Sequence, residues 1–442
     1  MKRIAVNIIL TSALFAGACN DHTDTNKTME SKAVDSAVYQ QGTFGYDLHF
    51  LQQHDTVIVL QSEKGAAQVI VSAKYQAKVF TSTAEGPGGL SFGWIHYKAF
   101  TGPADPHMNG YGGENRIWLG PEGGRFSLFF PKDSSMVFAN WKTPAAFDTE
   151  AWTVKEHGEG SVTLEKDMQL VNYAGTALSV SVKRSIAILS REAIDSLLHL
   201  LPDTAVKAVG YQTVNTLMNT GTQPWTETTG MPCIWMLDMF NPSPAAVIVI
   251  PYKEAAAGKM GGAEGTVTTG KMGDADKTVK TVRANKVATT DYFGEIPADR
   301  IRYEPGVLFF KADGKSRGKL GIHPSHAKPM AGSYDAVHRV LTITLFDVDS
   351  SGKYLNQEWN THKPPFSGDA VNAYNDGPLA DGSQMGPFYE MESVGPVASL
   401  AAGGSQSHRH AVFHFTGEEA GLDRICVQVL GVSLERIKKV FK

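Results

Sequence analysis

The sequence lacks any large excess of charge, and this absence excludes two classes of protein. Its 442 residues hold 41 Lys and Arg against 45 Asp and Glu, which gives a formal net charge of -4, and charged residues make up 19% of the chain. A disordered acidic chain or a nucleic-acid binder usually shows a strong excess of one sign. The composition therefore indicates a soluble globular protein with no nucleic-acid partner.

Long hydrophobic runs are missing except at the N-terminus. Lys2 and Arg3 precede an apolar run from Ile4 to Phe15, and small residues follow it. This order is typical of a signal peptide over residues 1–18, and the run is too short to span a membrane. The stretch that ends in Cys19 resembles a bacterial lipobox. That resemblance implies a lipid on Cys19, a membrane as partner, and a place in the bacterial cell envelope on the periplasmic or outer-membrane side; a plain secretory signal is the alternative.

Cysteines are few, and the three present have separate interpretations. Residues 19–41 are polar without a hydrophobic period, so they predict a flexible tether behind a lipidated Cys19. Cys233 and Cys426 each lie among apolar residues, which favours buried free thiols. A disulfide between these two remains open, because an exported protein meets an oxidising compartment.

Helical patterning is scarce, whereas strand patterning is abundant. Residues 178–188 alternate apolar and polar side chains over most of their length, as half-buried strands do. Short helices are expected only at residues 191–201 and after Leu434. Similar strand-like runs occur at residues 56–60, 67–72, 126–130, 161–164, 246–250, 307–310 and 340–346. With no internal repeat and no break in composition, the chain predicts one all-β domain over residues 42–442, with a mobile insertion at residues 253–286.

Familiar catalytic and cofactor motifs are absent. Gly-x-Ser-x-Gly and His-Glu-x-x-His do not occur, and the Gly- and Lys-rich insertion lacks the Gly-Lys-Ser/Thr ending of a phosphate loop. We therefore expect no cofactor. Four segments nevertheless concentrate polar, aromatic and glycine residues beyond what folding requires.

The first segment runs from Asn109 to Gly124, where glycine pairs flank a short block of charged and aromatic residues. Trp118 suits stacking on a sugar ring, and Arg116 suits hydrogen bonding to sugar hydroxyls. Glu114 and Glu122 add carboxylate acceptors. The segment indicates a carbohydrate site, and a glycine-rich hairpin with an internal Glu–Arg pair is the alternative.

The second segment runs from Val214 to Trp225 and is followed by residues 234–237, and the third begins with residues 372–378. Turn chemistry around the second favours a structural role, although Trp235 is a candidate for lining a cleft. Asn375 and Asp376 are candidate ligand-binding residues.

The third segment continues into a pair of carboxylates, Glu390 and Glu392. Residues two apart on a strand share a face, so these side chains point the same way. Neighbouring carboxylates can have their pKa values pushed apart, which separates acid and base roles. Because apolar residues such as Tyr389 border the pair, we favour a site here over an inert solvated face.

The fourth segment places His408, His410 and His414 on one face of a strand. Imidazoles can ligate a metal or act as general acids. Strand rise separates His410 and His414 by roughly 13 Å, so one strand cannot supply a whole metal site. We expect no metal, and we take His410 as a candidate catalytic or sugar-contacting residue.

The ordered set of motifs resembles the galactose mutarotase (aldose 1-epimerase) superfamily, and more closely an uncharacterised family of exported bacterial lipoproteins within it. The resemblance spans residues 41–431, and it implies a large twisted antiparallel β-supersandwich with very little helix and a carbohydrate-sized cleft across one sheet. Its parts are residues 112–124, Asn219-Thr220-Gly221, Gly332-Ser333-Tyr334-Asp335, Tyr374-Asn375-Asp376-Gly377-Pro378 and Phe388-Tyr389-Glu390-Met391-Glu392-Ser393.

The resemblance also implies roles. Mutarotases use a Glu ahead of a Pro as the base on the anomeric hydroxyl, and either Glu392 or Glu390 is similar to it ahead of Pro396. Their acid is a His in a His-x-Tyr-Phe-Asn setting, but the matching residues 233–241 contain no His. His410 or His323 would have to replace it.

Three functions remain open on the sequence. The chain binds a carbohydrate and acts on it by Glu-based acid–base chemistry, with Arg116 fixing the substrate. Alternatively it binds glycans without catalysis, or it is a polysaccharide lyase or hydrolase, for which a retaining hydrolase would need carboxyl groups about 5–5.5 Å apart.

Overall fold

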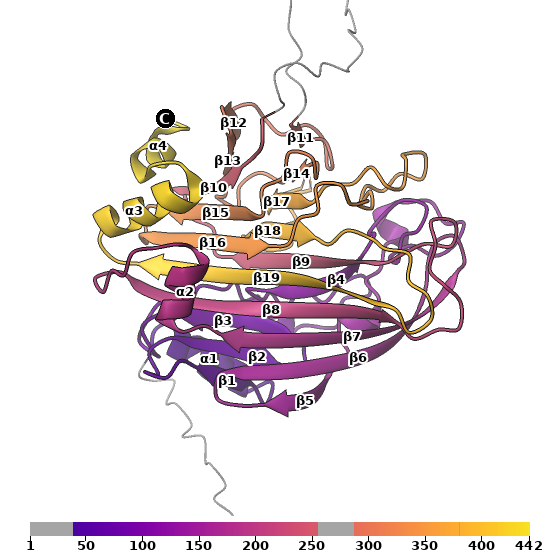
Figure 1. Ribbon diagram of the computed structural model, residues 1–442, viewed down its shortest axis with the longest axis horizontal. Helices are drawn as coiled ribbons and strands as arrows, with labels where there is room; N and C mark the ends of the chain where they lie inside the picture. The colour runs from indigo at the N-terminus through magenta and orange to yellow at the C-terminus, as the bar shows by residue number, and fades with distance from the viewer. Residues whose placement is uncertain (1–38, 255–286, 380) are drawn as a thin grey trace, which may run out of the picture. The chain divides into compact units, whose positions relative to one another are not determined.

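The computed structural model describes residues 39–254, 287–379 and 381–442, all of which belong to one compact unit (Figure 1). The predicted signal peptide, Cys19, the tether up to residue 38 and residues 255–286 of the predicted insertion lie outside the described residues. Within the described ranges, no helix has both the length and the apolar character needed to cross a membrane.

The larger of the two main sheets has ten strands in the order β12-β13-β10-β15-β16-β19-β8-β7-β6-β5. All of its neighbouring strands are antiparallel. Its strands are β5 (Thr153–His157), β6 (Ser161–Val171), β7 (Ala177–Ile188), β8 (Lys207–Asn219), β10 (Ala246–Pro251), β12 (Ile301–Glu304), β13 (Val307–Lys311), β15 (Met330–Asp335), β16 (Val340–Phe346) and β19 (Ser405–Thr416).

The second main sheet has six antiparallel strands in the order β11-β14-β17-β18-β9-β4. A three-stranded sheet, β1-β2-β3, adjoins it through a bridge between Val79 and Asn115, just ahead of β4. These strands are β1 (Ile58–Gln61), β2 (Gln68–Ser72), β3 (Lys78–Thr83), β4 (Arg116–Gly120), β9 (Cys233–Phe240), β11 (Ala288–Thr289), β14 (Gly318–Ile322), β17 (Val371–Asn375) and β18 (Tyr389–Val394).

Helices are short and lie around the sheets. In the view of Figure 1, α2 and α3 lie in front of the ten-stranded sheet, and the six-stranded sheet lies behind it. Ser190 begins α2 by accepting a hydrogen bond from the backbone of Ala193, as expected of an N-cap. The helices are α1 (Phe44–Gln52), α2 (Arg191–Leu197), α3 (Glu419–Leu430) and α4 (Leu434–Lys439), with 3-10 turns η1 (Tyr97–Phe100), η2 (Phe138–Asn140) and η3 (Ala145–Phe147).

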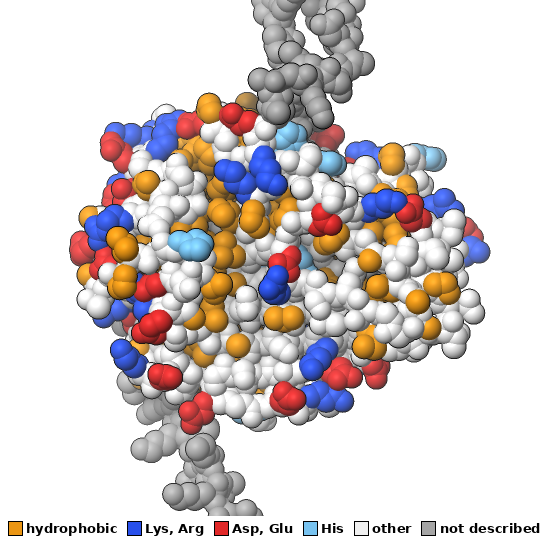
Figure 2. Space-filling model, viewed as in Figure 1, with side chains coloured by type: hydrophobic (Ala, Val, Ile, Leu, Met, Phe, Trp, Pro, Cys, Tyr) orange, Lys and Arg blue, Asp and Glu red, His pale blue; other side chains and the backbone are white. Residues whose placement is uncertain are grey.

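Alternation along each strand of the ten-stranded sheet supplies two apolar layers. In β19, Val412 faces the core between the two sheets, whereas Phe413 and Phe415 face the layer under the helices. Leu422 and Ile425 of α3 pack into that outer layer. Figure 2 shows this face of the molecule, with hydrophobic side chains gathered beside the helices and acidic and basic side chains interspersed around them. The expected all-β architecture of large antiparallel sheets is confirmed.

Two local expectations are wrong. Residues 126–130 do not form a strand. Instead Ser127 turns the chain there, because its hydroxyl accepts from the backbone of Phe129 and donates to that of Glu122. The helices α1 and α3 were not expected, although the apolar residues of α3 recur at helical spacing and Gly431 ends α3 with a left-handed backbone (φ +74°).

Cys233 and Cys426 are both free and buried, as their apolar surroundings predict. Burial raises the pKa of each thiol to about 12, so neither is a reactive thiolate at neutral pH.

Candidate functional site

A cleft of about 590 Å³ lies on the face of the six-stranded sheet that points away from the ten-stranded sheet. Strand alternation decides which side chains reach it. In β4, Arg116 and Trp118 line the cleft, while Ile117 between them packs into the core. The lining comprises Asp105, His107, Met108, Arg116, Trp118, Glu122, Phe138, Trp141, Trp235, Leu237, Met239, Phe293, Arg317, Lys319, Trp359, Tyr374, Asp376, Gly377, Leu379, Ser383, Gln384, Met385, Phe388 and Glu390.

Two buried ion pairs form the floor of this cleft. Arg116 on β4 donates to Glu390 on β18 over 2.6 Å, across the intervening strand β9. Lys319 on β14 contacts Glu392 on β18 at 2.9 Å. The four side chains are at most 8% exposed, so solvent screens these charges little.

Glu390 and Glu392 point to the same face but differ in what they meet. Glu392 has a fully buried side chain that accepts from the indole Nε1 of Trp235 over 2.7 Å as well as from Lys319. Glu390 lines the cleft. Burial raises the pKa of Glu390 to about 7; Arg116 opposes that shift, and the charge of Glu392 adds to it. Glu390 is therefore the carboxyl that can exchange a proton with a ligand.

Aromatic side chains form the walls. The rings of Trp118 and Trp235 meet edge to face with centroids 5.5 Å apart. The guanidinium of Arg116 lies 5.2 Å from the ring centre of Trp118, and the ammonium of Lys319 lies 4.6 Å from that of Trp235. Such cation–π contacts hold the charged groups and the rings in one arrangement.

A chain of polar groups continues from the floor toward the rim. Arg317 stacks on Phe293 at 3.9 Å and donates to the hydroxyl of Tyr374 over 3.2 Å. Tyr374 in turn donates to Asp376 over 2.8 Å. Among the described side chains, Arg317 has no carboxylate within ion-pair distance, so its guanidinium remains available to a ligand.

Glu122 supplies a second carboxyl with a raised pKa in the lining. Burial is the main cause of the shift, and the positive charge of Lys319 opposes it. A carboxyl of this kind holds its proton to higher pH than a solvated one and can act as an acid.

Besides Glu392, whose side chain is fully buried and absent from the lining, five residues that the sequence singled out do not reach the cleft. His410 and Glu114 lie between the two sheets. His410 contacts Asp238 at 2.6 Å and Ser393 at 2.8 Å, and Glu114 contacts His414 at 3.0 Å. Both are part of a buried polar network and cannot touch a ligand in the cleft.

The other three lie elsewhere. Asn375 is buried and donates to the backbone of Ser316 and Asp376. Tyr389 contacts Ser333 at 2.8 Å on the core side of β18. His323 is exposed beyond the end of β14 and contacts Ser325. None of them can replace the acid that the mutarotase resemblance requires.

Several lining residues were missed on the sequence. Lys319 is the single charged residue in a buried strand, which is a signal that could have been used. Trp141 and Trp359 come from irregular segments with no periodicity, so nothing local indicates that they meet. In the part of the chain that the structure describes, no group of three or more His, Cys, Asp or Glu could hold a metal.

A larger cavity of about 1120 Å³ lies beside the cleft, near the ends of β9 and β18. Within the described residues, no Lys or Arg of its lining forms an ion pair with a carboxylate of the same lining. The smaller cleft, with its two buried ion pairs, is therefore the candidate chemical site.

These features define an all-β protein of large antiparallel sheets, with an aromatic cleft that holds paired charges on the outer face of one sheet. The chain belongs to a family of unknown function, DUF6786, whose model matches residues 42–283 and 275–441. No curated protein matches the chain.

Solved structures similar to this chain include galactose mutarotase-like proteins and putative aldose 1-epimerases. A galactose mutarotase-like protein from Lactobacillus casei shares 11% identity with a TM-score of 0.43, over 81% of this chain and 99% of that one. A putative aldose 1-epimerase from Escherichia coli K12 shares 10% identity with a TM-score of 0.42, over 81% and 98%. Slr1438 from Synechocystis shares 12% identity with a TM-score of 0.43, over 82% and 96%.

Proposed function

We propose that the protein binds a carbohydrate in the cleft and moves protons on it through Glu390. The observation that carries this proposal is the position of Glu390, a buried carboxyl with a raised pKa that faces an aromatic cleft. Aromatic rings stack on the apolar faces of sugars, and the charged floor provides hydrogen-bond donors and acceptors for hydroxyls. A pKa of about 7 suits a group that must both take up and release a proton.

The reaction that fits these groups is the interconversion of sugar anomers. Glu390 takes the proton of the anomeric hydroxyl while Glu122 gives a proton to the ring oxygen, so that the bond from the anomeric carbon to the ring oxygen breaks. The aldehyde group of the open chain rotates about its bond to the next carbon, and the ring closes on the other face of the aldehyde. In closing, Glu390 returns its proton to the new anomeric hydroxyl and Glu122 regains the proton that it gave. Arg116 orients Glu390 through their ion pair, and Arg317 is placed to bind a hydroxyl.

The test is anomer exchange measured by NMR on a panel of free aldoses. Glu390→Gln keeps the size of the side chain and removes its basicity, so the exchange rate should fall by about 100-fold or more. Glu156→Gln, on an exposed strand far along the ten-stranded sheet, is the matched control and should leave the rate unchanged. Undiminished exchange in Glu390→Gln would show that Glu390 is not the base.

A second function is favoured by one specific feature: both Glu390 and Glu392 are closed in ion pairs. An ion pair favours the ionised form of a carboxylate, which can then accept hydrogen bonds from hydroxyls without taking up their protons. On this view the cleft binds glycans without changing them. This alternative predicts that a sugar quenches the fluorescence of the cleft tryptophans while anomer exchange is not accelerated and no new product forms.

We propose further that the chain is exported and anchored by a lipid on Cys19, on the strength of the N-terminal sequence alone. Cys19→Ser should release the protein from the membrane fraction of a bacterial host. Equal membrane retention of the variant would contradict the lipid anchor.

A further inference from the structure

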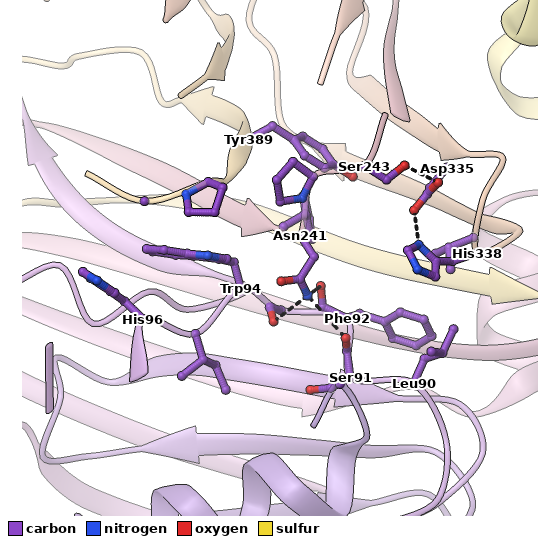
Figure 3. A pocket seen from close by; sticks show the side chains of 18 of the residues that line it. Leu90, Ser91, Phe92, Trp94, His96, Asn241, Ser243, Asp335, His338 and Tyr389 are labelled. Carbon is purple, nitrogen blue, oxygen red and sulfur yellow. Dashed lines mark hydrogen bonds and ion pairs between the residues drawn. The ribbon is translucent and has the colours of Figure 1, made fainter. Parts of the chain in front are cut away.

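The larger cavity has walls suited to a carbohydrate as well (Figure 3). It is formed by residues 90–98, by the chain after β9, by the turn between β15 and β16, and by the segment that leads into β18. Side chains labelled in Figure 3 are Leu90, Ser91, Phe92, Trp94, His96, Asn241, Ser243, Asp335, His338 and Tyr389.

One wall of this cavity is aromatic. The rings of Trp94 and His96 stack with centroids 5.3 Å apart and planes 26° apart, and Figure 3 shows them side by side. The Nδ1 of His96 contacts the backbone carbonyl of Gly110 at 3.0 Å, which fixes the imidazole. Trp94 itself is buried, so it backs the imidazole of His96, which is partly exposed and is the ring that can stack on a sugar.

The opposite wall is polar. Asp335 contacts His338 at 2.5 Å and accepts from Ser243 at 2.5 Å. Asn241 donates to the backbone carbonyl of Gly93 over 3.1 Å, which fixes its amide in the cavity wall. With Lys98 also in the lining, no one sign of charge prevails. Such a wall fits an uncharged ligand with many hydroxyls better than an ion.

The cavity and the cleft are neighbours. Gln384 and Met385 belong to the linings of both, and both residues are exposed. Trp94 of the cavity packs against Phe388 of the cleft with ring centroids 4.7 Å apart. One short exposed segment therefore separates the two spaces, and a chain-like ligand can pass over it.

We propose that the ligand is an oligosaccharide, with one end in the cleft at Glu390 and the remainder crossing Gln384 and Met385 into the larger cavity. This inference rests on the proposed carbohydrate function of the cleft. Size supports it, because the cavity alone, at about 1120 Å³, exceeds the range of about 300–1,000 Å³ usual for one small ligand.

The experiment measures the affinity of the full chain for glucose, galactose and xylose and for their linear oligomers of increasing length, by tryptophan fluorescence. Affinity should rise with chain length once the ligand reaches the cavity. His96→Ala should lower the affinity for the longer oligomers by about threefold to tenfold and leave the affinity for the monosaccharides unchanged.

His107→Ala is the matched control. His107 is also a partly buried histidine, stacked on Phe138 at 4.4 Å and in contact with a backbone carbonyl, but it lines the cleft. It should weaken mono- and oligosaccharides alike. If His96→Ala lowers the melting temperature too far for binding measurements, Leu90→Trp serves as a second variant. Its larger side chain fills the larger cavity from the rim, so it should weaken only the longer oligomers.

The outcomes separate the two proposals. Affinity that does not grow with chain length, or that falls equally for short and long ligands in both cavity variants, overturns the extended site and leaves the cleft function standing. If no sugar of any length binds, the carbohydrate function itself fails, and the extended site fails with it.

Discussion

At the scale of single residues, the cleft depends on two carboxylates that are two positions apart on β18 and have different surroundings. Trp235 and Lys319 enclose Glu392, so it has no room to act on a ligand. Glu390 meets the cleft and keeps Arg116 as its partner. Environment therefore distinguishes Glu390, the proposed proton-transfer group, from Glu392, which is closed off from the cleft, although the sequence presents the two as equivalent.

The raised pKa of Glu390 predicts a pH dependence with a definite sign. The folded protein releases this proton near pH 7, whereas the unfolded chain releases it near the ordinary value of 4.5. The stability contributed by the protonated group is thus complete below about 4.5 and is lost as the pH rises through about 7. Urea unfolding measured across this pH range should show a decline in unfolding free energy that the Glu390→Gln variant lacks. If the unfolding free energies of parent and variant change with pH in parallel, the raised pKa is contradicted. Anomer exchange should rise as the pH passes through about 7, where Glu390 of the folded protein loses its proton.

The buried pair of Lys319 and Glu392 predicts a non-additive double mutant. Lys319→Met leaves a buried carboxylate without its counter-charge and should cost about 3–5 kcal/mol of unfolding free energy. The double variant Lys319→Met, Glu392→Met removes both charges and should recover much of that loss. Denaturant unfolding of the single and double variants measures the cycle, and costs that simply add would mean that the pair is not coupled.

At the scale of elements, strand alternation made much of the site predictable. It places Arg116 and Trp118 on one face of β4, and Glu390 and Glu392 on one face of β18. Local pattern cannot tell which strands become neighbours, so the approach of β14 with Lys319 was not foreseen. The same limit explains His410: alternation groups it with His408 and His414, but only the sheet packing shows that this face meets Asp238 rather than the cleft.

The inter-sheet network at β19 predicts a structural role for His410. Burial lowers the pKa of neighbouring His408 to about 3, so that histidine stays neutral and shares the hydroxyl of Ser393 with His410. His410→Ala should lower the unfolding free energy by about 1–3 kcal/mol, because it leaves the Oδ2 of Asp238 unpaired while Asn115 still donates to Oδ1. Sugar affinity of the folded variant should stay as in the parent; a selective loss of affinity at unchanged stability would return His410 to the site.

At the scale of the whole molecule, the two main sheets have different roles. The ten-stranded sheet is apolar on its helix-covered face and carries part of a polar network on its inner face. That network fixes the six-stranded sheet, whose outer face can then hold buried charges without losing its shape. The fold class could be predicted because strand patterns are local. The cleft walls could not, because irregular segments such as those of Trp141 and Trp359 are brought together only by long-range strand pairing.

The most direct test of the central claim is a crystal structure of the protein soaked with the sugar that binds best in fluorescence titration. We predict a sugar ring in the cleft, stacked on Trp118 or Trp235, with its anomeric hydroxyl within hydrogen-bond distance of Glu390. A sugar bound only on another surface, with the cleft free of it at saturating concentration, would contradict the account.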